Sequence, residues 1–565
     1  MLQRTPLAVA VATLLLGSVA LAQELPPQAD NAWFTEAQAT LQERLARQLN
    51  TSRAKNVILM ISDGNGVGTN YATRLWHGQQ NGNYGDENVL PQESMPHLAL
   101  VKTYNVNAQT PDSSGTGTAM LSGVKTKAGV VNVNENVSRG DCSTVMDNAL
   151  TPITRMMSDA GKATGIISTA RITHATPASG FAQSADRNFE DDSGLPEGCE
   201  VPDIATQLVT AMSEGWVDIA MGGGRRHFLP AEVTDEEGQA GRRTDGVNLI
   251  EQAQAAGARY VFDDASFADV GSLDDGPILG LFESSHMQYE YDRTGEPSLA
   301  EMVEASIGAL QGAEQGFFLE VEAGRVDHAN HAGNLHRVLE DGVAFAEAVA
   351  VARELTDESD TLIIVTADHE HAIAFNGYCG RGTPITGLCH AIDGEGVEYL
   401  ADTLELADDG RPYSVVGYLN GPGSVIRKEA MPPALSMEAD HEQGGGEGTG
   451  TDMAMNDADA EPAPIGTGGD VVAQQLLDRL DITTETDEAG NSTDYRWIGS
   501  RGPLTQEEAT DPDYLQQATI PKSSETHSGE DVAVYASGPF AHLFDGTVEQ
   551  NFIFHVMHHA AFGAE

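Results

Sequence analysis

Several strand-like apolar runs of this chain end in a side chain that can hold a metal ion or carry a phosphate. The runs, each with its end residue, are 56–62 with Asp63, 316–321 with Glu322, and 361–367 with Asp368 and His369. One such run is ordinary, but several interleaved with helical segments are typical of a parallel α/β sheet. Because such sheets bind ligands at the carboxyl ends of their strands, we expect one site there.

A serine at the expected start of a helix is a candidate nucleophile. Ser113 follows Pro111 and Asp112, and the small residues from Gly115 to Ala119 let a ligand approach the helix N-terminus closely. Backbone N–H groups there favour an anionic phosphate. Asp112 or Ser113 could equally be a helix cap, and both roles are compatible. The absence of Gly-x-Ser-x-Gly around Ser113 disfavours a serine esterase.

Carboxylate and imidazole side chains have the spacing of metal ligands. Asp327 and His331 are four residues apart and would project from one face of a helix. Zinc accepts both types, and a catalytic site needs three protein ligands, for which His527 is the candidate third. Taken alone, the Asp327/His331 spacing is more typical of a surface ion pair, so the prediction depends on the whole set.

A second metal could lie between Asp63, Asp368 and His369, with Ser113 as an alkoxide in its coordination sphere. The metal would activate the hydroxyl group without a histidine base. His371 is also near, and its role stays open. These residues predict a hydrolase with metals and a covalent intermediate.

Composition predicts one large globular domain with an insertion. The chain has 565 residues, 40% of them hydrophobic, and 31 Lys and Arg against 85 Asp and Glu, a formal charge of -54. Such a charge repels nucleic acid and anionic lipid, so we expect no nucleic acid binding. It fits a salty working medium or a generally acidic proteome.

The N-terminus is typical of a signal peptide. Arg4 precedes an apolar stretch from about Leu7, and residues 20–22 form a small-residue cleavage site, so we expect signal peptide 1–22 and a periplasmic or secreted protein. The alternative is an uncleaved anchor, but the stretch is short for a membrane span and no later segment is long enough. No membrane association is expected.

Export favours disulfides over free thiols. Four cysteines allow three pairings. Cys379 and Cys389 are close in sequence in a Gly-rich loop and are expected to pair, which leaves Cys142 for Cys199.

Strands alternating with helical stretches predict a doubly wound, mainly parallel α/β sheet. The predicted strands are 56–62, 98–106, 164–169, 216–221, 317–321 and 361–366, and the predicted packing helices include 335–355 and 549–561. After residue 375 the chain becomes rich in Gly, Pro and acidic residues. We therefore expect a catalytic domain of residues 23–375 and 518–565, with an inserted accessory region, 376–517, that contains an acidic Gly-rich loop, 437–470.

In several stretches that contain the candidate site residues, the sequence resembles the alkaline phosphatases. The matching stretches follow the family order and surround Asp63, residues 111–113, 174–177, 321–328, 366–369 and 526–531. The resemblance implies hydrolysis of small-molecule phosphate monoesters, two zinc ions and one magnesium ion around a phosphoserine, a crown-like inserted region and a homodimer.

Carried over motif by motif, the resemblance assigns three metal sites. The first zinc would be held by Asp327, His331 and His527, the second zinc by Asp63, Asp368, His369 and Ser113, and the magnesium by Asp63, Thr176 and Glu322.

Arg187 occupies the place of the family arginine that clamps two phosphate oxygens, which its planar fork suits; without the resemblance it would be a surface loop arginine. His174 and His328 stand where the best-known bacterial enzymes have Asp and Lys, as in the animal enzymes, and the imidazole is expected to weaken or retune the magnesium site. Glu283 and Glu296 match a fourth, calcium-like site of the animal enzymes only poorly.

Two other functions are weighed against a monoesterase. A diesterase or sulfatase on the same scaffold would keep much of the metal set, but Arg187 and the Thr176/Glu322 site favour a doubly charged monoester. A sulfatase would also need a modified cysteine as its nucleophile, and no cysteine lies near Ser113 in the sequence. An exported phosphate-binding protein would not need a nucleophile beside paired metals.

Overall fold

The computed structural model describes residues 28–268, 270–393, 399–430, 483–486 and 492–563. The chain separates into two units, Met1–Leu49 and Asn50–Glu565, and the first contains helix α1 (Ala32–Ala46). The expected signal peptide, 1–22, and the acidic loop, 437–470, lie outside the described residues. Across the described ranges, no helix is long and apolar enough to cross a bilayer.

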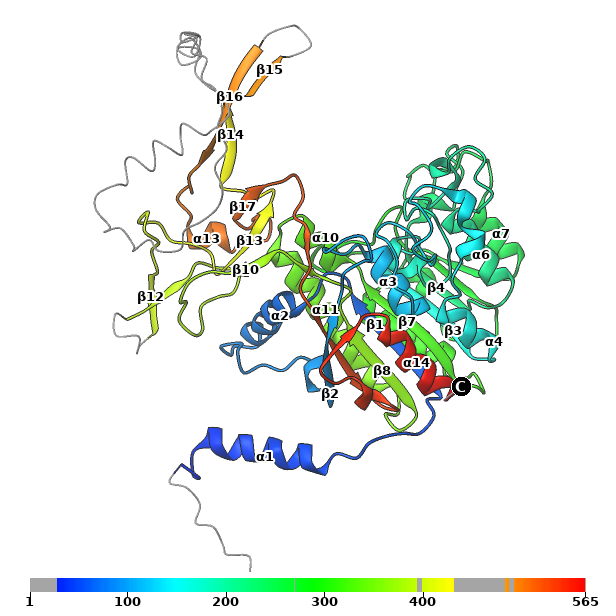
Figure 1. Ribbon diagram of the computed structural model, residues 1–565, viewed down its shortest axis with the longest axis horizontal. Helices are drawn as coiled ribbons and strands as arrows, with labels where there is room; N and C mark the ends of the chain where they lie inside the picture. Colours follow the sequence, from blue (N-terminus) through cyan, green and yellow to red (C-terminus); the bar gives the residue numbers. More distant parts are fainter. Residues whose placement is uncertain (1–27, 269, 394–398, 431–482, 487–491, 564–565) are drawn as a thin grey trace, which may run out of the picture. The chain divides into compact units, whose positions relative to one another are not determined.

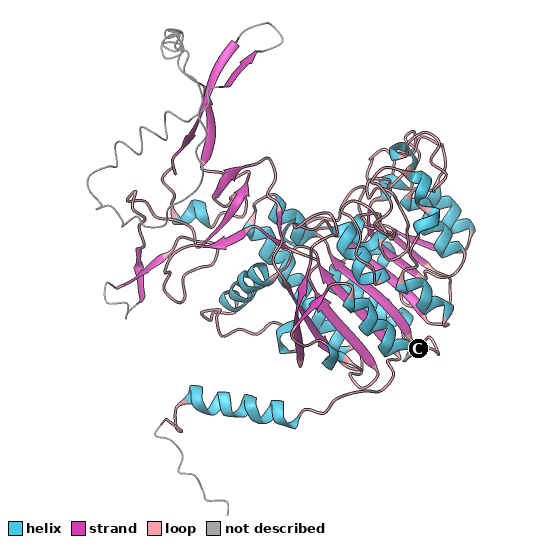
Figure 2. Cartoon of the chain, in the orientation of Figure 1, coloured by secondary structure: helices cyan, strands magenta, loops and turns pink. Residues whose placement is uncertain are grey.

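The second unit is built on a ten-stranded sheet with helices on both faces (Figures 1 and 2). Its strands, in spatial order, are β20 (Thr547–Glu549), β2 (His97–Lys102), β19 (Val532–Ser537), β8 (Thr361–Thr366), β1 (Asn56–Ser62), β7 (Phe317–Ala323), β3 (Ala163–Arg171), β4 (Ile219–Gly223), β6 (Ile278–Leu281) and β5 (Arg259–Val261). Neighbouring strands are parallel except β19, which is antiparallel to β2 and β8. The predicted fold is confirmed.

The central strand β1 shows how the sequence produces this layered architecture. Six of its seven residues are fully buried. Ile58 and Met60 pack into one apolar cluster, and Val57 and Leu59 pack into another. A strand buried on both faces needs apolar residues at consecutive positions, which is why parallel strands have near-continuous Val, Ile and Leu runs.

Helices cover both faces of the sheet and supply the opposite halves of these clusters. The first face is covered by α9 (Leu299–Leu310) and α11 (Leu335–Glu354); the second face is covered by α3 (Ser113–Ser122), α4 (Ile153–Asp159) and α14 (Phe552–Phe562), and farther along by α6 (Ile204–Ser213) and α7 (Leu249–Ala255). The candidate catalytic residues that follow these strands are therefore held by a sheet that helices cover on both faces.

Residues after β8 form smaller sheets outside the large one. Their strands are β10 (Ile373–Phe375), β13 (Val416–Gly421) and β17 (Ala518–Pro521) in one, β11 (His390–Ile392) and β12 (Tyr399–Leu404) in another, and β14 (Ile426–Ala430), β16 (Ser492–Gly499) and β15 (Thr483–Thr486) in a third. The chain then returns to the large sheet at β19.

Both predicted disulfides are present. Cys142 bonds to Cys199 with an S–S distance of 2.04 Å, and Cys379 bonds to Cys389 at 2.11 Å. The second one closes a loop in the segment of smaller sheets. Disulfides of this kind are typical of proteins that fold in an oxidising compartment.

Candidate active site

Ser113 is the first residue of α3 and lies beside two predicted metal ligands. Asp112 caps the helix, since its side chain accepts a hydrogen bond from the Ser114 backbone N–H at 3.2 Å. The Ser113 hydroxyl is buried, 3.4 Å from Asp63 Oδ1 and 3.2 Å from His369 Nε2. Asp112 thus serves as the cap while the Ser113 oxygen stays available for chemistry.

Asp63, Asp368 and His369 converge on the same point as the Ser113 hydroxyl. Asp63 follows β1, and the other two follow the neighbouring strand β8. His369 Nε2 lies 3.3 Å from Asp63 Oδ1 and 3.3 Å from Asp368 Oδ2. Parallel pairing of β1 and β8 brings these strand ends together, as the sequence predicts for a sheet edge.

Asp327, His331 and His527 form a second group of potential ligands. Asp327 and His331 lie on one face of α10 (Arg325–His331), with His331 Nε2 3.4 Å from Asp327 Oδ1. His527 arrives from β18 (His527–Ser528), and its Nε2 lies 3.2 Å from the same oxygen. The helical spacing and the distant third ligand therefore meet at one atom.

Glu322 and Thr176 lie on the other side of Asp63. The Thr176 hydroxyl is 3.5 Å from Asp63 Oδ2, and Ser168 donates to Glu322 Oε2. The other Glu322 oxygen is buried and has no partner among the described residues. The ligand atoms of Asp63, Glu322 and His174 lie within 4.8 Å of one another.

The electrostatics of these groups fit bound cations. Burial and the negative charges of Asp368, Asp327 and Glu322 raise the pKa of Asp63 well above its usual value. Burial also raises the pKa of Glu322 to about 7. Crowded, buried carboxylates with an unpartnered oxygen are costly unless metal ions neutralise them, so the residues fit the metals that the sequence implies.

The metal-free protein is expected to lose stability as pH rises from about 4.5 to 7. The Glu322 carboxyl has a pKa of about 7 when folded, against 4.5 as its ordinary value, so the folded state binds this proton more tightly. A raised folded pKa contributes stability below the unfolded pKa, and the contribution disappears as pH passes the folded pKa. The loss is on the order of 3 kcal/mol. Thermal melting of chelator-treated protein across this range measures it.

Glu322→Gln should make that pH dependence less steep, because it removes one of the protons that couple to folding, while Asp63 keeps its own contribution. Glu304→Gln is the matched control, since it removes an equal charge from an exposed position on α9. A melting curve with the same pH slope in Glu322→Gln as in the control would show that Glu322 does not carry the effect.

Arg187 reaches the mouth of the site and is held by two neighbours. Its Nη1 donates to Asp112 Oδ1 at 2.6 Å, and its Nη2 lies 2.9 Å from His174 Nε2. Although burial alone would raise it, the charge of Arg187 holds the pKa of Asp112 well below its usual range. A cavity of about 360 Å³ opens here; its lining includes Ser113, Arg187, Asp327, His328, His331 and His527.

His174 and His328 pack against a third histidine, His286, which sequence reasoning missed. The ring of His286 lies 4.0 Å from that of His328 and 5.3 Å from that of His174. Burial lowers the pKa of His328 to about 3 and also lowers the pKa values of His174 and His286. This flank of the site is therefore lined by neutral imidazoles, and no motif in the sequence connects His286 to them.

His371 joins the first metal group to a buried glutamate. Its Nε2 lies 2.8 Å from Asp327 Oδ1, and its Nδ1 lies 2.5 Å from Glu525 Oε2. Glu525 also accepts the backbone N–H of Ala372 at 2.7 Å. His371, whose role the sequence left open, is therefore a buried bridge between Glu525 and Asp327 and orients the Asp327 carboxylate. Its position after Asp368-His369, and that of Glu525 two residues before His527, were the available signals.

Glu283 and Glu296, the poor matches to a fourth metal site, both bond to Gln288. Gln288 donates its side-chain N–H to Glu283 at 3.0 Å and its backbone N–H to Glu296 at 2.7 Å. Burial raises the pKa of Glu296 to about 8.

Comparisons with known proteins agree over nearly the whole chain. A family model described as Alkaline phosphatase matches residues 54–562. The human tissue-nonspecific alkaline phosphatase isozyme is 36% identical over 98% of this chain and 92% of its own length, and an alkaline phosphatase of Gadus morhua is 36% identical over 95% and 98%. Two solved structures share the fold. The alkaline phosphatase of Thermus thermophilus has a TM-score of 0.56 at 24% identity, covering 96% of each chain, and that of the Antarctic bacterium TAB5 has a TM-score of 0.54 at 18% identity, covering 91% of this chain and 100% of its own.

Proposed function

The chain belongs to the alkaline phosphatase family of phosphate monoester hydrolases, and from this premise we propose that Ser113 is its nucleophile. The observation that carries the proposal is the convergence of the Ser113 hydroxyl on Asp63 and His369, with Arg187 at the same cavity. Attack by Ser113 on the phosphorus breaks the bond to the alcohol and forms a phosphoserine, which water then hydrolyses to inorganic phosphate.

The proposed cofactors are two zinc ions and one magnesium ion. Asp327, His331 and His527 would hold the first zinc, Asp63, Asp368, His369 and Ser113 the second, and Asp63, Thr176 and Glu322 the magnesium. When bound, such ions lower the pKa of hydroxyl groups and water and stabilise negative charge on phosphoryl oxygens. Imidazole and carboxylate donors support zinc, and the oxygen-only third set supports magnesium.

The side chains around the metals position the reaction. Arg187 would hold two phosphate oxygens with its planar fork, and Asp112 and His174 keep that fork oriented. The N-terminus of α3 places backbone N–H groups next to the nucleophile. Because phosphoryl transfer passes through a loose, highly charged transition state, most of the rate enhancement comes from this positioning and charge stabilisation.

The substrate class is tested with p-nitrophenyl phosphate and its diester analogue. The wild type is expected to prefer the monoester, since Arg187 and the three proposed metal ions suit a doubly charged phosphate group. Arg187→Lys should lower kcat/KM for the monoester by roughly 10- to 100-fold, because one point charge replaces a bidentate fork. Steady-state kinetics with both substrates measure this.

Arg139→Lys is the matched control for that variant. Arg139 Nε lies 2.9 Å from Asp186 Oδ2, and Asp186 directly precedes Arg187 in the sequence. The Arg139 side chain itself is 46% exposed. Its replacement should leave kcat/KM unchanged. Equal losses in both variants, or a wild type that prefers the diester, would contradict a monoester clamp at Arg187.

Further proposals concern the setting of the enzyme. We propose cleavage of residues 1–22 and export to the periplasm or medium, which the two disulfides support. The charge of -54 supports a salty working environment. We propose that residues 23–375 and 518–565 together form one catalytic domain and that the protein is a homodimer. The accessory region 376–517 would border the subunit interface or the site entrance.

A further inference from the structure

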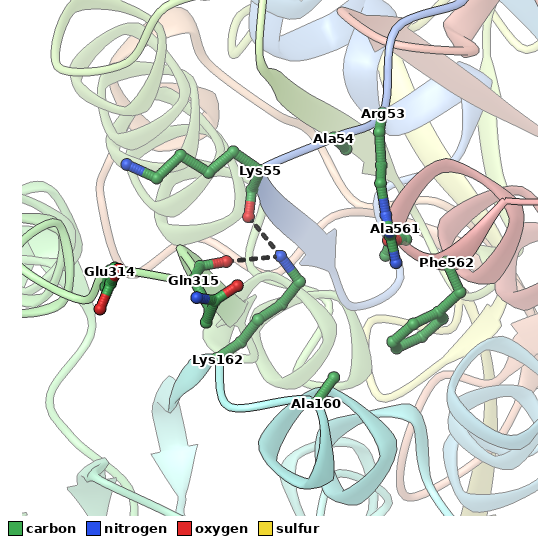
Figure 3. Close-up of a pocket in the computed structure, with 9 residues that line it drawn as sticks. All are labelled: Arg53, Ala54, Lys55, Ala160, Lys162, Glu314, Gln315, Ala561 and Phe562. Atoms are coloured by element: carbon green, nitrogen blue, oxygen red, sulfur yellow. Dashed lines mark hydrogen bonds between the residues drawn. The ribbon is translucent and has the colours of Figure 1, made fainter.

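A second cavity lies at the opposite end of the central strands from the metal ligands. Lys55 directly precedes β1, Lys162 directly precedes β3, and Gln315 lies two residues before β7 (Figure 3). This cavity, which we call the basic cavity, has a volume of about 290 Å³. The seven residues of β1 span roughly 20 Å, so the basic cavity is separate from the active site.

Three cations line the basic cavity: Arg53, Lys55 and Lys162. Within the described part of the chain, no carboxylate oxygen lies within 4.0 Å of their side-chain nitrogens. Glu314 also lines the cavity, beyond that distance. Burial and the positive charges of Arg53 and Lys55 lower the pKa of Lys162 to about 8. The three cations therefore repel one another in a protein whose net charge is -54.

Two of the cations are fixed by the backbone and keep donors free. Lys162 Nζ donates to the carbonyl oxygens of Lys55 at 2.6 Å and Gln315 at 2.8 Å (Figure 3), which uses two of its three protons. Arg53 Nε donates to the Ala561 carbonyl at 2.5 Å, and among the described residues its two terminal amino groups have no hydrogen-bond partner. Anchored donors lose little entropy on binding.

One part of the lining is apolar. Phe562, at the end of α14, lies beside the Arg53 side chain, and alanines fill the neighbouring positions (Figure 3). A cavity with two anchored cations, Arg53 and Lys162, and an aromatic wall has the composition of a small-molecule site.

We propose that the basic cavity binds a small organic phosphate or phosphonate dianion, with its charged group between Arg53 and Lys162 and its apolar group against Phe562. The site goes beyond the phosphatase activity and does not depend on it. Two charges are favoured over one, because no carboxylate of the described residues pairs with Arg53, Lys55 or Lys162. The guanidinium fork suits the paired oxygens of such a group.

The test uses the metal-loaded enzyme and phenylphosphonate, which has a P–C bond in place of the ester P–O–C linkage and is therefore not cleaved by a phosphate monoesterase. Calorimetric titration counts all bound ligand, whereas the inhibition constant against p-nitrophenyl phosphate reports the active site alone. The wild type is expected to bind two equivalents per chain. Arg53→Gln and Lys162→Met should weaken one of the two by about tenfold or more and leave the inhibition constant unchanged.

Control variants and probes separate a built site from general charge. Arg381→Ala removes one cation from an exposed ion pair with Asp86 and Glu87 and should leave both equivalents intact. Phe562→Ala should weaken phenylphosphonate but not methylphosphonate at the second site. Benzoate should bind that site about tenfold more weakly than phenylphosphonate.

The proposal is overturned by a single equivalent whose Kd equals the inhibition constant. It is also overturned if Arg53→Gln and Lys162→Met leave the second equivalent unchanged, or if Arg381→Ala weakens it equally. Arg53→Gln keeps the test decisive should Lys162→Met unfold, because Arg53 makes one backbone hydrogen bond and Lys162 makes two.

Discussion

Ser113→Ala is expected to lower kcat for p-nitrophenyl phosphate by about 10⁴-fold or more. The Ser113 oxygen lies 3.2 Å from His369 Nε2 and 3.4 Å from Asp63 Oδ1, so the substitution removes the proposed nucleophile from its place beside two proposed metal ligands. The Michaelis constant should change far less, since Arg187 and the metal ligands stay in place. Steady-state kinetics measure the loss, and rapid quenching should trap phosphoserine in the wild type only.

Ser114→Ala is the matched control for that result. Ser114 is the next residue of the same helix, but its hydroxyl donates to Asp112 and accepts the backbone N–H of Gly129. Its loss should cost much less activity than the loss of Ser113. Full monoesterase activity in Ser113→Ala would be incompatible with the phosphoserine mechanism, whatever the control does.

Removal of metals by a chelator is expected to reduce monoesterase activity by roughly 10³-fold or more, because metal ions supply several kcal/mol of transition-state stabilisation. In the metal-free protein the four carboxylates of Asp63, Glu322, Asp327 and Asp368 are left buried without cations. Elemental analysis of the purified protein should give zinc and magnesium in about a two-to-one ratio. Activity should return when both metals are added.

The reconstitution arms distinguish the sites. Zinc alone should restore part of the activity, and magnesium alone should restore almost none, because Ser113 belongs to a proposed zinc set. Glu322→Gln should remove the additional effect of magnesium while the response to zinc remains. An enzyme that keeps its activity after complete metal removal would rule out the proposed cofactors, even if the fold stays intact.

The sheet could be predicted from local sequence wherever a strand is buried on both faces. Strands 56–62 and 361–366 have the predicted bounds, because long Val, Ile and Leu runs end abruptly at Asp63 and Asp368. The predicted helix 335–355 is α11 with one residue fewer. Such elements need no information from distant parts of the chain.

Elements that depend on distant pairing were less well predicted. The expected helix 549–561 begins only at Phe552, because Thr547–Glu549 pairs with β2 as an edge strand. The expected strand 98–106 ends at Lys102, because its pairing with β19 reaches only Val101 and its pairing with β20 only Lys102. A partner more than 400 residues away cannot be seen in a short sequence window.

The same distinction applies to the site. Candidate ligands that follow strands or share a helix face could be proposed from spacing, and the structure brings their side chains together in groups. The bridge from Asp327 through His371 to Glu525 could not, because it joins a helix, a short strand and a distant loop. The contact of His286 with His328 also joins distant segments, because His286 lies in a loop and His328 lies on helix α10.

The position of β19 in the sheet has a consequence for biosynthesis. One edge of β8 pairs with β1, but its other edge waits for residues 532–537, which the ribosome makes after the whole segment of smaller sheets. Until then the nascent chain presents an open, apolar strand edge, a known risk for aggregation. His527 emerges just before that strand, so the last of the proposed metal ligands and the strand that closes this edge are synthesised together. A chain that stops early would therefore lack both a closed sheet and a complete metal set, which couples quality control of the fold to acquisition of activity.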